Sequence, residues 1–155
     1  MSVRTPYAAV TAEPLDAARL LADCVSPSDG AALLFWGVVR EENDGRAVTQ
    51  LEYHAYAEMA EREMLRIAGE AIERFGTGDI RVVHRVGLLG IGEASVAIVV
   101  ASPHRGEAYE ASRYVIEELK RRVPVWKREG YVEGDREWVP GFTPSEAEAG
   151  AGGAR

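Results

Sequence analysis

The sequence predicts an α+β fold in which a mixed, mostly antiparallel sheet is flanked by helices. Two apolar segments, 80–89 and 93–102, are separated only by the Gly-Ile-Gly of residues 90–92, a pattern typical of an antiparallel hairpin. Two longer segments, 58–75 and 102–122, repeat apolar residues every three or four positions, as amphipathic helices do. Because hairpin strands and helices are interspersed, the pattern does not favour a doubly wound parallel sheet.

Several shorter elements are expected before the first long helix. Residues 3–11 are predicted to form an edge strand, because Pro6 cannot donate a hydrogen bond from a central position. Pro14 suits the first position of a short helix. The nearly continuous apolar run 31–40 is typical of a strand covered on both faces. The Asp-Gly pair within 41–46 favours a tight turn or loop after it.

The remaining elements are one strand of mixed faces and two short extended segments near the end of the chain. The strand of mixed faces is expected over 47–56, and the short segments over 123–127 and 136–139. There is neither an internal repeat nor a linker, so residues 1–142 are expected to form one domain. The low-complexity tail 143–155 is expected to be disordered.

The bulk composition limits the class of function. The 155 residues, 46% hydrophobic and 28% charged, have the composition of an ordinary globular domain. A formal net charge of -7 argues against nucleic-acid binding, which needs a basic face. The longest apolar run, 96–101, is far shorter than the roughly 20 residues of a membrane helix, and no signal peptide is apparent. Cys24 is the only cysteine, so a reducing, cytoplasmic location is expected.

The segment before the last long helix has the features of an anion site. Ser102 and Pro103 are typical of an N-cap and a first helical residue, which would place His104 and Arg105 in the first turn. Unpaired N–H groups and the positive end of the helix dipole favour a phosphate or carboxylate there. The alternative is a charged loop that faces solvent.

Arg40 is a second candidate for anion binding. It follows an apolar strand and precedes a polar loop, a position where ligand-binding residues are common. The alternative is an ordinary arginine at the end of a strand, which the spacing alone favours.

Lys120 and Lys127 are the third group of candidates. Pro124 ends the helix that carries Lys120, and the extended chain after it places Lys127 beside Trp126 in an otherwise apolar segment. A lysine that is partly buried near other cations loses its proton more readily, and could act as a general acid/base or nucleophile. The alternative is a solvated basic patch formed by Lys120, Arg121, Arg122, Lys127 and Arg128.

Metal and cysteine chemistry find less support in the sequence. His54, His84 and His104 fall on separate elements without the spacing of metal ligands. Cys24 is expected on the apolar side of a short helix, without a cation to activate its thiol. No metal site is therefore expected.

Taken together, the motifs of this chain are similar to those of the catalytic (large) subunits of molybdopterin synthase. They are FWGVVR followed by NDG, LEYHAYAEMAE, VVHRVGLLGIGEASVAIVVASPHRGEAYEA and LKRRVPVWKRE, and the resemblance extends from about Gly30 to Val139. Their order and spacing are specific together, and the Pro-x-Trp-Lys-x-Glu of the last motif is the most diagnostic.

The resemblance implies an α/β hammerhead fold and an enzyme that converts cyclic pyranopterin monophosphate into molybdopterin by installing both dithiolene sulfurs. It implies that sulfur arrives as a thiocarboxylate on the C-terminal Gly-Gly of a small ubiquitin-like subunit, whose tail enters a pocket. It further implies a heterotetramer, in which a central homodimer of large subunits carries a small subunit at each end. No cofactor is expected for this step.

The resemblance also implies roles for residues. Lys120 and Lys127 match the essential lysines of the family, and the two are assigned to the partner's C-terminus and to the pterin intermediate, respectively. Arg40, His104 and Arg105 match its anion-binding residues. His104 and Arg105 are expected to come from the second copy across the dimer interface.

Three more residues are expected in or beside the pocket, namely Phe35, Glu129 and Arg136. The family commonly has Gly-Asp-Arg-Trp near this point, whereas here Glu137 separates Arg136 from Trp138. The position of Arg136 therefore departs from the family pattern.

Two other functions remain compatible with the sequence. A non-catalytic module that binds a ubiquitin-like tail would need the groove but not the anion cluster. An enzyme acting on another small anionic ligand would use the same cationic pocket without a pterin substrate.

Overall fold

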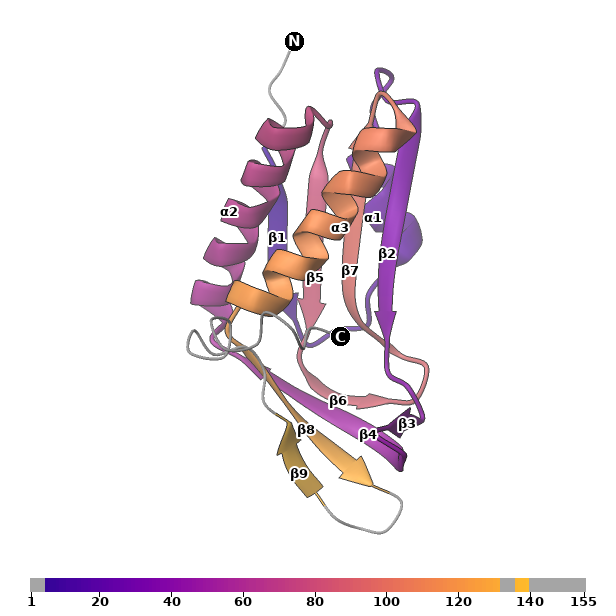
Figure 1. Ribbon diagram of the computed structural model, residues 1–155, viewed down its shortest axis with the longest axis vertical. Coiled ribbons are helices and arrows are strands. Elements are labelled where there is room, and N and C mark those ends of the chain that lie inside the picture. The colour runs from indigo at the N-terminus through magenta and orange to yellow at the C-terminus, as the bar shows by residue number, and fades with distance from the viewer. Residues whose placement is uncertain (1–4, 132–135, 140–155) are drawn as a thin grey trace.

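The computed structural model describes residues 5–131 and 136–139, which form three helices and two β-sheets (Figure 1). The helices are α1 (Ala17–Cys24), α2 (Ala57–Phe75) and α3 (Arg105–Arg122). The strands are β1 (Tyr7–Thr11), β2 (Ala31–Val38), β3 (Glu42–Asn43), β4 (Arg46–Ala55), β5 (Ile80–Arg85), β6 (Gly87–Gly90), β7 (Ala94–Ser102), β8 (Val125–Tyr131) and β9 (Arg136–Val139). This arrangement confirms the predicted α+β class.

The first sheet has the strand order β1-β5-β7-β2, and β7 is buried along its whole length. β7 pairs antiparallel with β2 and β5, whereas the edge strand β1 pairs parallel with β5, as a mostly antiparallel sheet requires. The strand predicted over 31–40 is confirmed as β2, which both α1 and α3 contact, although it is less covered than predicted. β2 ends at Val38, lies at the other edge and is largely half-buried. A continuous apolar run does not tell which strand lies in the centre of a sheet.

The helices cover both faces of this sheet, with α2 and α3 on one side and α1 on the other (Figure 1). The buried residues that α2 and α3 contribute to the core are Ala60, Met64, Ile67, Ala68, Ala71, Ala108, Ala111, Val115 and Leu119. They follow the three- and four-residue spacing from which the two helices were predicted. Each larger aliphatic side chain buried here stabilises the fold by about 1.5–3 kcal/mol.

The strand expected over 80–89 is divided between the two sheets. β5 ends at Arg85, and β6 begins at Gly87, whose φ of 99° is open mainly to glycine. β5 pairs with β7 as predicted, but β6 turns away and pairs with β4 in the second sheet. The predicted hairpin through residues 90–92 is therefore wrong, because the strand before the turn, β6, does not pair with β7. A turn in the sequence does not show with which strand the preceding segment pairs.

Two helices begin later in the chain than their prolines predicted. The N-cap of α1 is Asp16, whose side chain accepts a hydrogen bond from the N–H of Arg19 at 3.1 Å, and Pro14 lies outside the helix. Ser102 is the last residue of β7, and the N-cap of α3 is His104. In α1 the Asp16 carboxylate satisfies an unpaired N–H, which a proline cannot do.

The second sheet has the order β3-β4-β8-β9, with β6 added alongside β4. The segment 41–46 was predicted as a tight turn or loop, and the turn is confirmed at Asp44 and Gly45, whose φ angles are 50° and 77°. Such turns match the twist of a hairpin. The short strand β3 before this turn was not predicted. β8 continues to Tyr131 beyond the predicted end at 127, because β4 pairs with it antiparallel along its length.

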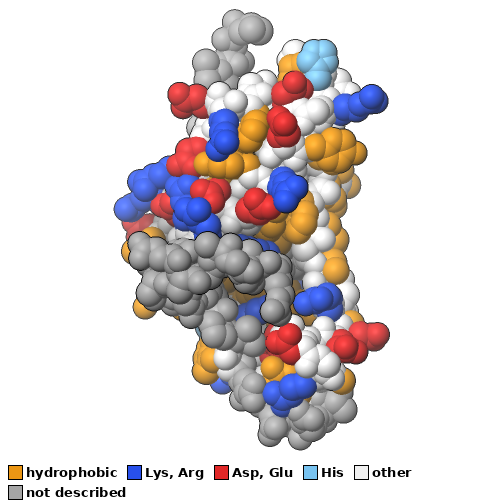
Figure 2. Space-filling view, in the orientation of Figure 1, with side chains coloured by type: hydrophobic (Ala, Val, Ile, Leu, Met, Phe, Trp, Pro, Cys, Tyr) orange, Lys and Arg blue, Asp and Glu red, His pale blue; other side chains and the backbone are white. Residues whose placement is uncertain are grey.

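Arg122 joins α2 to α3 through a network of ion pairs. Its guanidinium lies 2.6 Å from Glu63 and 2.7 Å from Glu70, and the Tyr114 hydroxyl donates to Glu70 at 2.7 Å. The Arg122 side chain is 20% exposed. Figure 2 shows acidic and basic side chains intermixed over the face that α2 and α3 form. The network fixes the end of α3 against α2.

We expect the stability of the protein to fall at acidic pH through Glu70. The hydrogen bond from Arg122 chiefly, and that from Tyr114, hold the pKa of Glu70 at about 2, below its ordinary value of 4.5. Because the folded pKa is the lower one, this carboxylate stabilises the fold above pH 4.5, and the contribution is lost as the pH falls toward 2.

Urea denaturation at a series of pH values measures this effect. Glu70→Gln should remove part of the dependence between these pH values, whereas Glu73→Gln, at an exposed position on the same helix, should leave it unchanged. An identical pH dependence in Glu70→Gln and the unsubstituted protein would contradict the assignment.

In the described ranges, each helix is too short or too polar to cross a bilayer. The predicted tail, 143–155, lies outside the described residues, as do residues 1–4.

Candidate functional site

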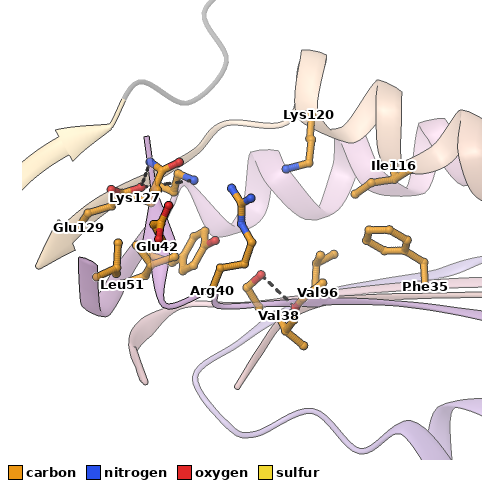
Figure 3. Close-up of a pocket in the computed structure, with 15 residues that line it drawn as sticks. Phe35, Val38, Arg40, Glu42, Leu51, Val96, Ile116, Lys120, Lys127 and Glu129 are labelled. Carbon is orange, nitrogen blue, oxygen red and sulfur yellow. Dashed lines mark hydrogen bonds and ion pairs between the residues drawn. The ribbon is translucent and has the colours of Figure 1, made fainter. Parts of the chain in front are cut away.

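A cavity of about 140 Å³ lies between the two sheets and the C-terminal part of α3 (Figure 3). The residues that line it are Phe35, Gly37, Val38, Arg40, Glu42, Asn43, Val48, Leu51, Tyr53, Ser95, Val96, Ile116, Lys120, Lys127 and Glu129. Five of these were singled out from the sequence, namely Phe35, Arg40, Lys120, Lys127 and Glu129. The cavity thus brings together residues from β2, β3, β4, β7, β8 and α3.

Lys120 and Lys127 are the only lysines in the chain, and both line this cavity. Lys120 lies in the last turn of α3, and Lys127 lies on β8. Between them Val123 has the extended angles φ -87° and ψ 128°, and Pro124 follows. The break in the helix therefore lets one lysine from a helix and one from a strand face the same space.

The cationic side of the cavity consists of Lys120, Arg40 and Lys127. Although part of the Lys120 side chain is exposed, its ammonium group is partly shielded from water, and this desolvation lowers the pKa of Lys120. The positive charges of Lys127 and Arg40 lower the pKa further. Figure 3 shows the side chains of Lys120 and Arg40 pointing toward one another. Within the part of the chain that the structure describes, no carboxylate pairs with either of them. Such a cluster favours a bound anion.

Glu129 supplies a buried carboxylate beside Lys127, on the same strand β8. It is 1% exposed, and its Oε1 lies 3.9 Å from the Nζ of Lys127. Oε1 also accepts a hydrogen bond from the Asn43 side chain at 2.7 Å, and Oε2 accepts one from the Tyr131 hydroxyl at 2.7 Å. The carboxylate is therefore held in one orientation by donors on both oxygens.

The sequence did not single out Asn43, Tyr53 or Ser95, although all three line the cavity. Tyr53 lies opposite Lys127 in the β4–β8 pair, and burial raises the pKa of Tyr53, so its phenol stays protonated and can donate a hydrogen bond. The alternation of Leu51 and Tyr53 indicates a shared strand face. Which face meets the lysines depends on the pairing with β8, which the sequence does not state.

His104 and Arg105 do not reach the cavity of their own chain. Both are exposed at the N-terminal end of α3, and the 15 residues from Arg105 to Lys120 span about 22 Å along a helix. His104 is the N-cap and makes no side-chain capping hydrogen bond. Arg136 lies on β9, but its side chain is outside the described residues.

Cys24 is not available for sulfur chemistry. It is 0% exposed and lies on the α1 side of the first sheet beside Val99 and Ala101. Its Sγ donates to the carbonyl oxygen of Asp79 at 3.3 Å, and burial raises the pKa of the thiol to about 12. A protonated, buried thiol is a poor nucleophile, so this chain has no cysteine that could carry sulfur.

Comparison with known proteins identifies the family. The family described as MoaE protein matches residues 10–122. The chain belongs to this family. Among MoaE relatives, the molybdopterin synthase catalytic subunit of Pyrococcus abyssi is 48% identical over 116 residues, which are 75% of this chain and 78% of that protein.

Two solved structures have the same fold. The crystal structure of molybdopterin synthase from Staphylococcus aureus has a TM-score of 0.81 and 36% identity, over 85% of this chain and 96% of that one. A complex of subunits 1 and 2 of molybdopterin-converting factor from Helicobacter pylori has a TM-score of 0.72 at 22% identity, over 94% and 97% of the two chains, and bears on the fold alone. This MoaE chain is thus a sulfur-transferring enzyme of molybdenum cofactor biosynthesis.

Proposed function

We propose that the cavity is the active site in which this MoaE chain forms the dithiolene of molybdopterin. Sulfur is transferred from the C-terminal thiocarboxylate of a small ubiquitin-like subunit to cyclic pyranopterin monophosphate. One observation carries the proposal. The only two lysines of the chain meet Arg40 in one cavity, where Lys120 and Arg40 pair with no carboxylate of the described residues.

The chemistry needs cations at this point. The thiocarboxylate and the substrate phosphate are both anions, which Lys120, Lys127 and Arg40 can bind. Each transfer forms a carbon–sulfur bond and expels an oxygen, which must be protonated as it leaves. Water then cleaves the resulting thioester and returns the tail as a carboxylate. Lysines can stabilise the developing oxyanion and exchange these protons, and we assign Lys120 to the tail and Lys127 to the pterin.

The burial of Cys24 supports an external source of sulfur. Because this chain offers no reactive thiol, the sulfur has to arrive on another molecule. The fold is shared with one chain of the two-subunit complex from Helicobacter pylori, which is compatible with a small subunit as that source.

Formation of the product tests the reaction directly. The protein is mixed with a thiocarboxylated small subunit and cyclic pyranopterin monophosphate, and the dithiolene product is measured. Stoichiometric product is expected. A tail-binding module without catalytic activity would instead bind the small subunit and yield no product, and an enzyme for another anionic ligand would not bind the pterin phosphate.

We further propose that His104 and Arg105 complete the anion site of a second copy of the chain. They lie about 22 Å along α3 from Lys120, too far to serve the cavity of their own chain. A homodimer would bring the exposed end of one α3 to the cavity of its partner, so that each site uses residues from both copies.

Complementation between two inactive variants tests this arrangement. Arg105→Ala and Lys120→Ala should each be inactive alone. After subunit exchange in a mixture, about a quarter of the sites should be intact, because half of the dimers are mixed and each has one complete site. Product formation is the readout. If mixing restores no activity while exchange is demonstrated with tagged chains, Arg105 does not act across a dimer interface.

A further inference from the structure

The hairpin formed by β3 and β4 makes one wall of the cavity, to which it contributes Glu42 and Asn43. β3 has only two residues, and its pairing with β4 consists of Glu42 opposite Ala47 and Asn43 opposite Arg46. A two-residue strand provides little backbone pairing to hold a hairpin in place. Backbone pairing with β8 holds β4, so side-chain contacts matter for the position of β3 and the turn.

Two such contacts join the hairpin to β8. The Asn43 Nδ2 donates to Glu129 Oε1 at 2.7 Å, and the Arg46 guanidinium lies 3.5 Å from the centre of the Tyr131 ring. Tyr131 in turn donates its hydroxyl to the other oxygen of Glu129 at 2.7 Å. Both contacts therefore converge on the buried carboxylate of Glu129.

The hydrogen bond from Asn43 also fixes the carboxylate that lies beside Lys127. Asn43 and Lys127 share the same oxygen of Glu129, at 2.7 Å and 3.9 Å. A buried carboxylate is costly unless donors satisfy it, and a neutral amide can do so without cancelling its charge. With Asn43 in place, a neutral donor holds the Glu129 carboxylate in the position where it lies beside the lysine.

We propose that Asn43 is a positioning residue that closes the β3–β4 hairpin over the cavity and fixes the Glu129 carboxylate beside Lys127. The catalytic consequence rests on the proposed function, in which Lys127 acts on the pterin intermediate. The role of Asn43 in closing the hairpin does not depend on the proposed function, because the hairpin is closed in the free protein. Asn43 itself touches Glu129 and carries out no proton transfer.

Three variants separate this role from a general effect on the fold. Asn43→Ala removes the donor, and Asn43→Asp replaces it with a second carboxylate next to Glu129. Asp44→Asn is the matched control, because Asp44 is exposed in the turn of the same hairpin and asparagine tolerates its positive φ of 50°.

Amide hydrogen exchange of the free protein reports on the hairpin. The N–H of Val48 donates to the carbonyl of Glu41 at 2.8 Å across the hairpin, and Val48 is buried. Loss of a hydrogen bond to a charged group should speed its exchange by about tenfold or more in Asn43→Ala. Asp44→Asn should exchange at the rate of the unsubstituted protein.

Asn43→Asp should depend on pH in a way that Asn43→Ala does not. Two carboxylates in contact cannot both be ionised, so they share a proton once the pH is low enough. Protection of Val48, corrected for intrinsic exchange, should therefore recover in Asn43→Asp as the pH falls from 8 to about 5. In Asn43→Ala the corresponding loss of protection should be the same across this range.

Turnover gives the catalytic readout. In Asn43→Ala we expect kcat for dithiolene formation to fall about tenfold, with the KM for the small subunit unchanged, because the tail is assigned to Lys120. Wild-type protection and wild-type kcat in Asn43→Ala would overturn the proposal, as would a pH-independent loss of protection in Asn43→Asp. If the unsubstituted protein forms no dithiolene, the proposed function fails, while the exchange data still decide whether Asn43 closes the hairpin.

Discussion

Replacing Lys120 or Lys127 with alanine should abolish dithiolene formation, with a loss of about 100-fold or more for each variant. The two side chains supply the positive charge beside the reacting groups, and the chain has no other lysine that could take their place. Lys120→Arg should restore binding of the tail but not full turnover. Guanidinium stays protonated at neutral pH and cannot exchange a proton as an amine with a lowered pKa can.

The measurement is single-turnover formation of dithiolene from thiocarboxylated small subunit and pterin substrate. Arg121→Ala is the matched control for Lys120→Ala, because Arg121 is the next residue in α3, carries the same charge and is 62% exposed. It should retain nearly full activity. Circular dichroism and thermal unfolding should show both lysine variants folded. Near-normal turnover in both would rule out the lysine mechanism.

Arg122→Met should lower the free energy of unfolding by about 2–4 kcal/mol. Among the substitutions of charged residues proposed here, this is the largest expected effect on stability. Methionine retains the aliphatic stem but leaves Glu63 and Glu70 without the guanidinium that contacts them at 2.6 and 2.7 Å. Two carboxylates would then face each other between α2 and α3, with Glu63 only 20% exposed.

Urea denaturation at neutral pH measures this loss. Arg113→Met is the control on the same helix. Arg113 pairs with Glu117 at 2.9 Å, but the two side chains are 81% and 62% exposed. Solvent weakens such a pair, so its loss should cost far less than loss of the Arg122 network. Equal effects of the two substitutions would show that the Arg122 network adds nothing to an ordinary surface pair.

Local patterns predicted the helices of this protein well. The three- and four-residue spacing in 58–75 and 102–122 identified the buried faces of α2 and α3, because such a face follows from the helical repeat alone. The strands were predicted less completely. The run 31–40 gave no sign that β2 lies at an edge, and Gly87 gave no sign that β6 joins another sheet.

The candidate site shows the same division. Lys120, Lys127, Arg40, Phe35 and Glu129 were singled out from motifs, and the structure places all five on one cavity. Asn43 and Tyr53 were missed, because their roles arise from pairing between β3, β4 and β8.

The sequence by itself determined the family, the faces of the long helices and the break at Pro124 that separates the two lysines, because these depend on neighbouring residues and on motif identity. Only the tertiary structure decided which groups meet. The pairing of β3, β4 and β8 brought Asn43 within 2.7 Å of Glu129, and the packing of α3 against the sheets brought Lys120 to the same cavity as Lys127. Such distances depend on contacts between residues far apart in the chain, which short-range patterns do not encode.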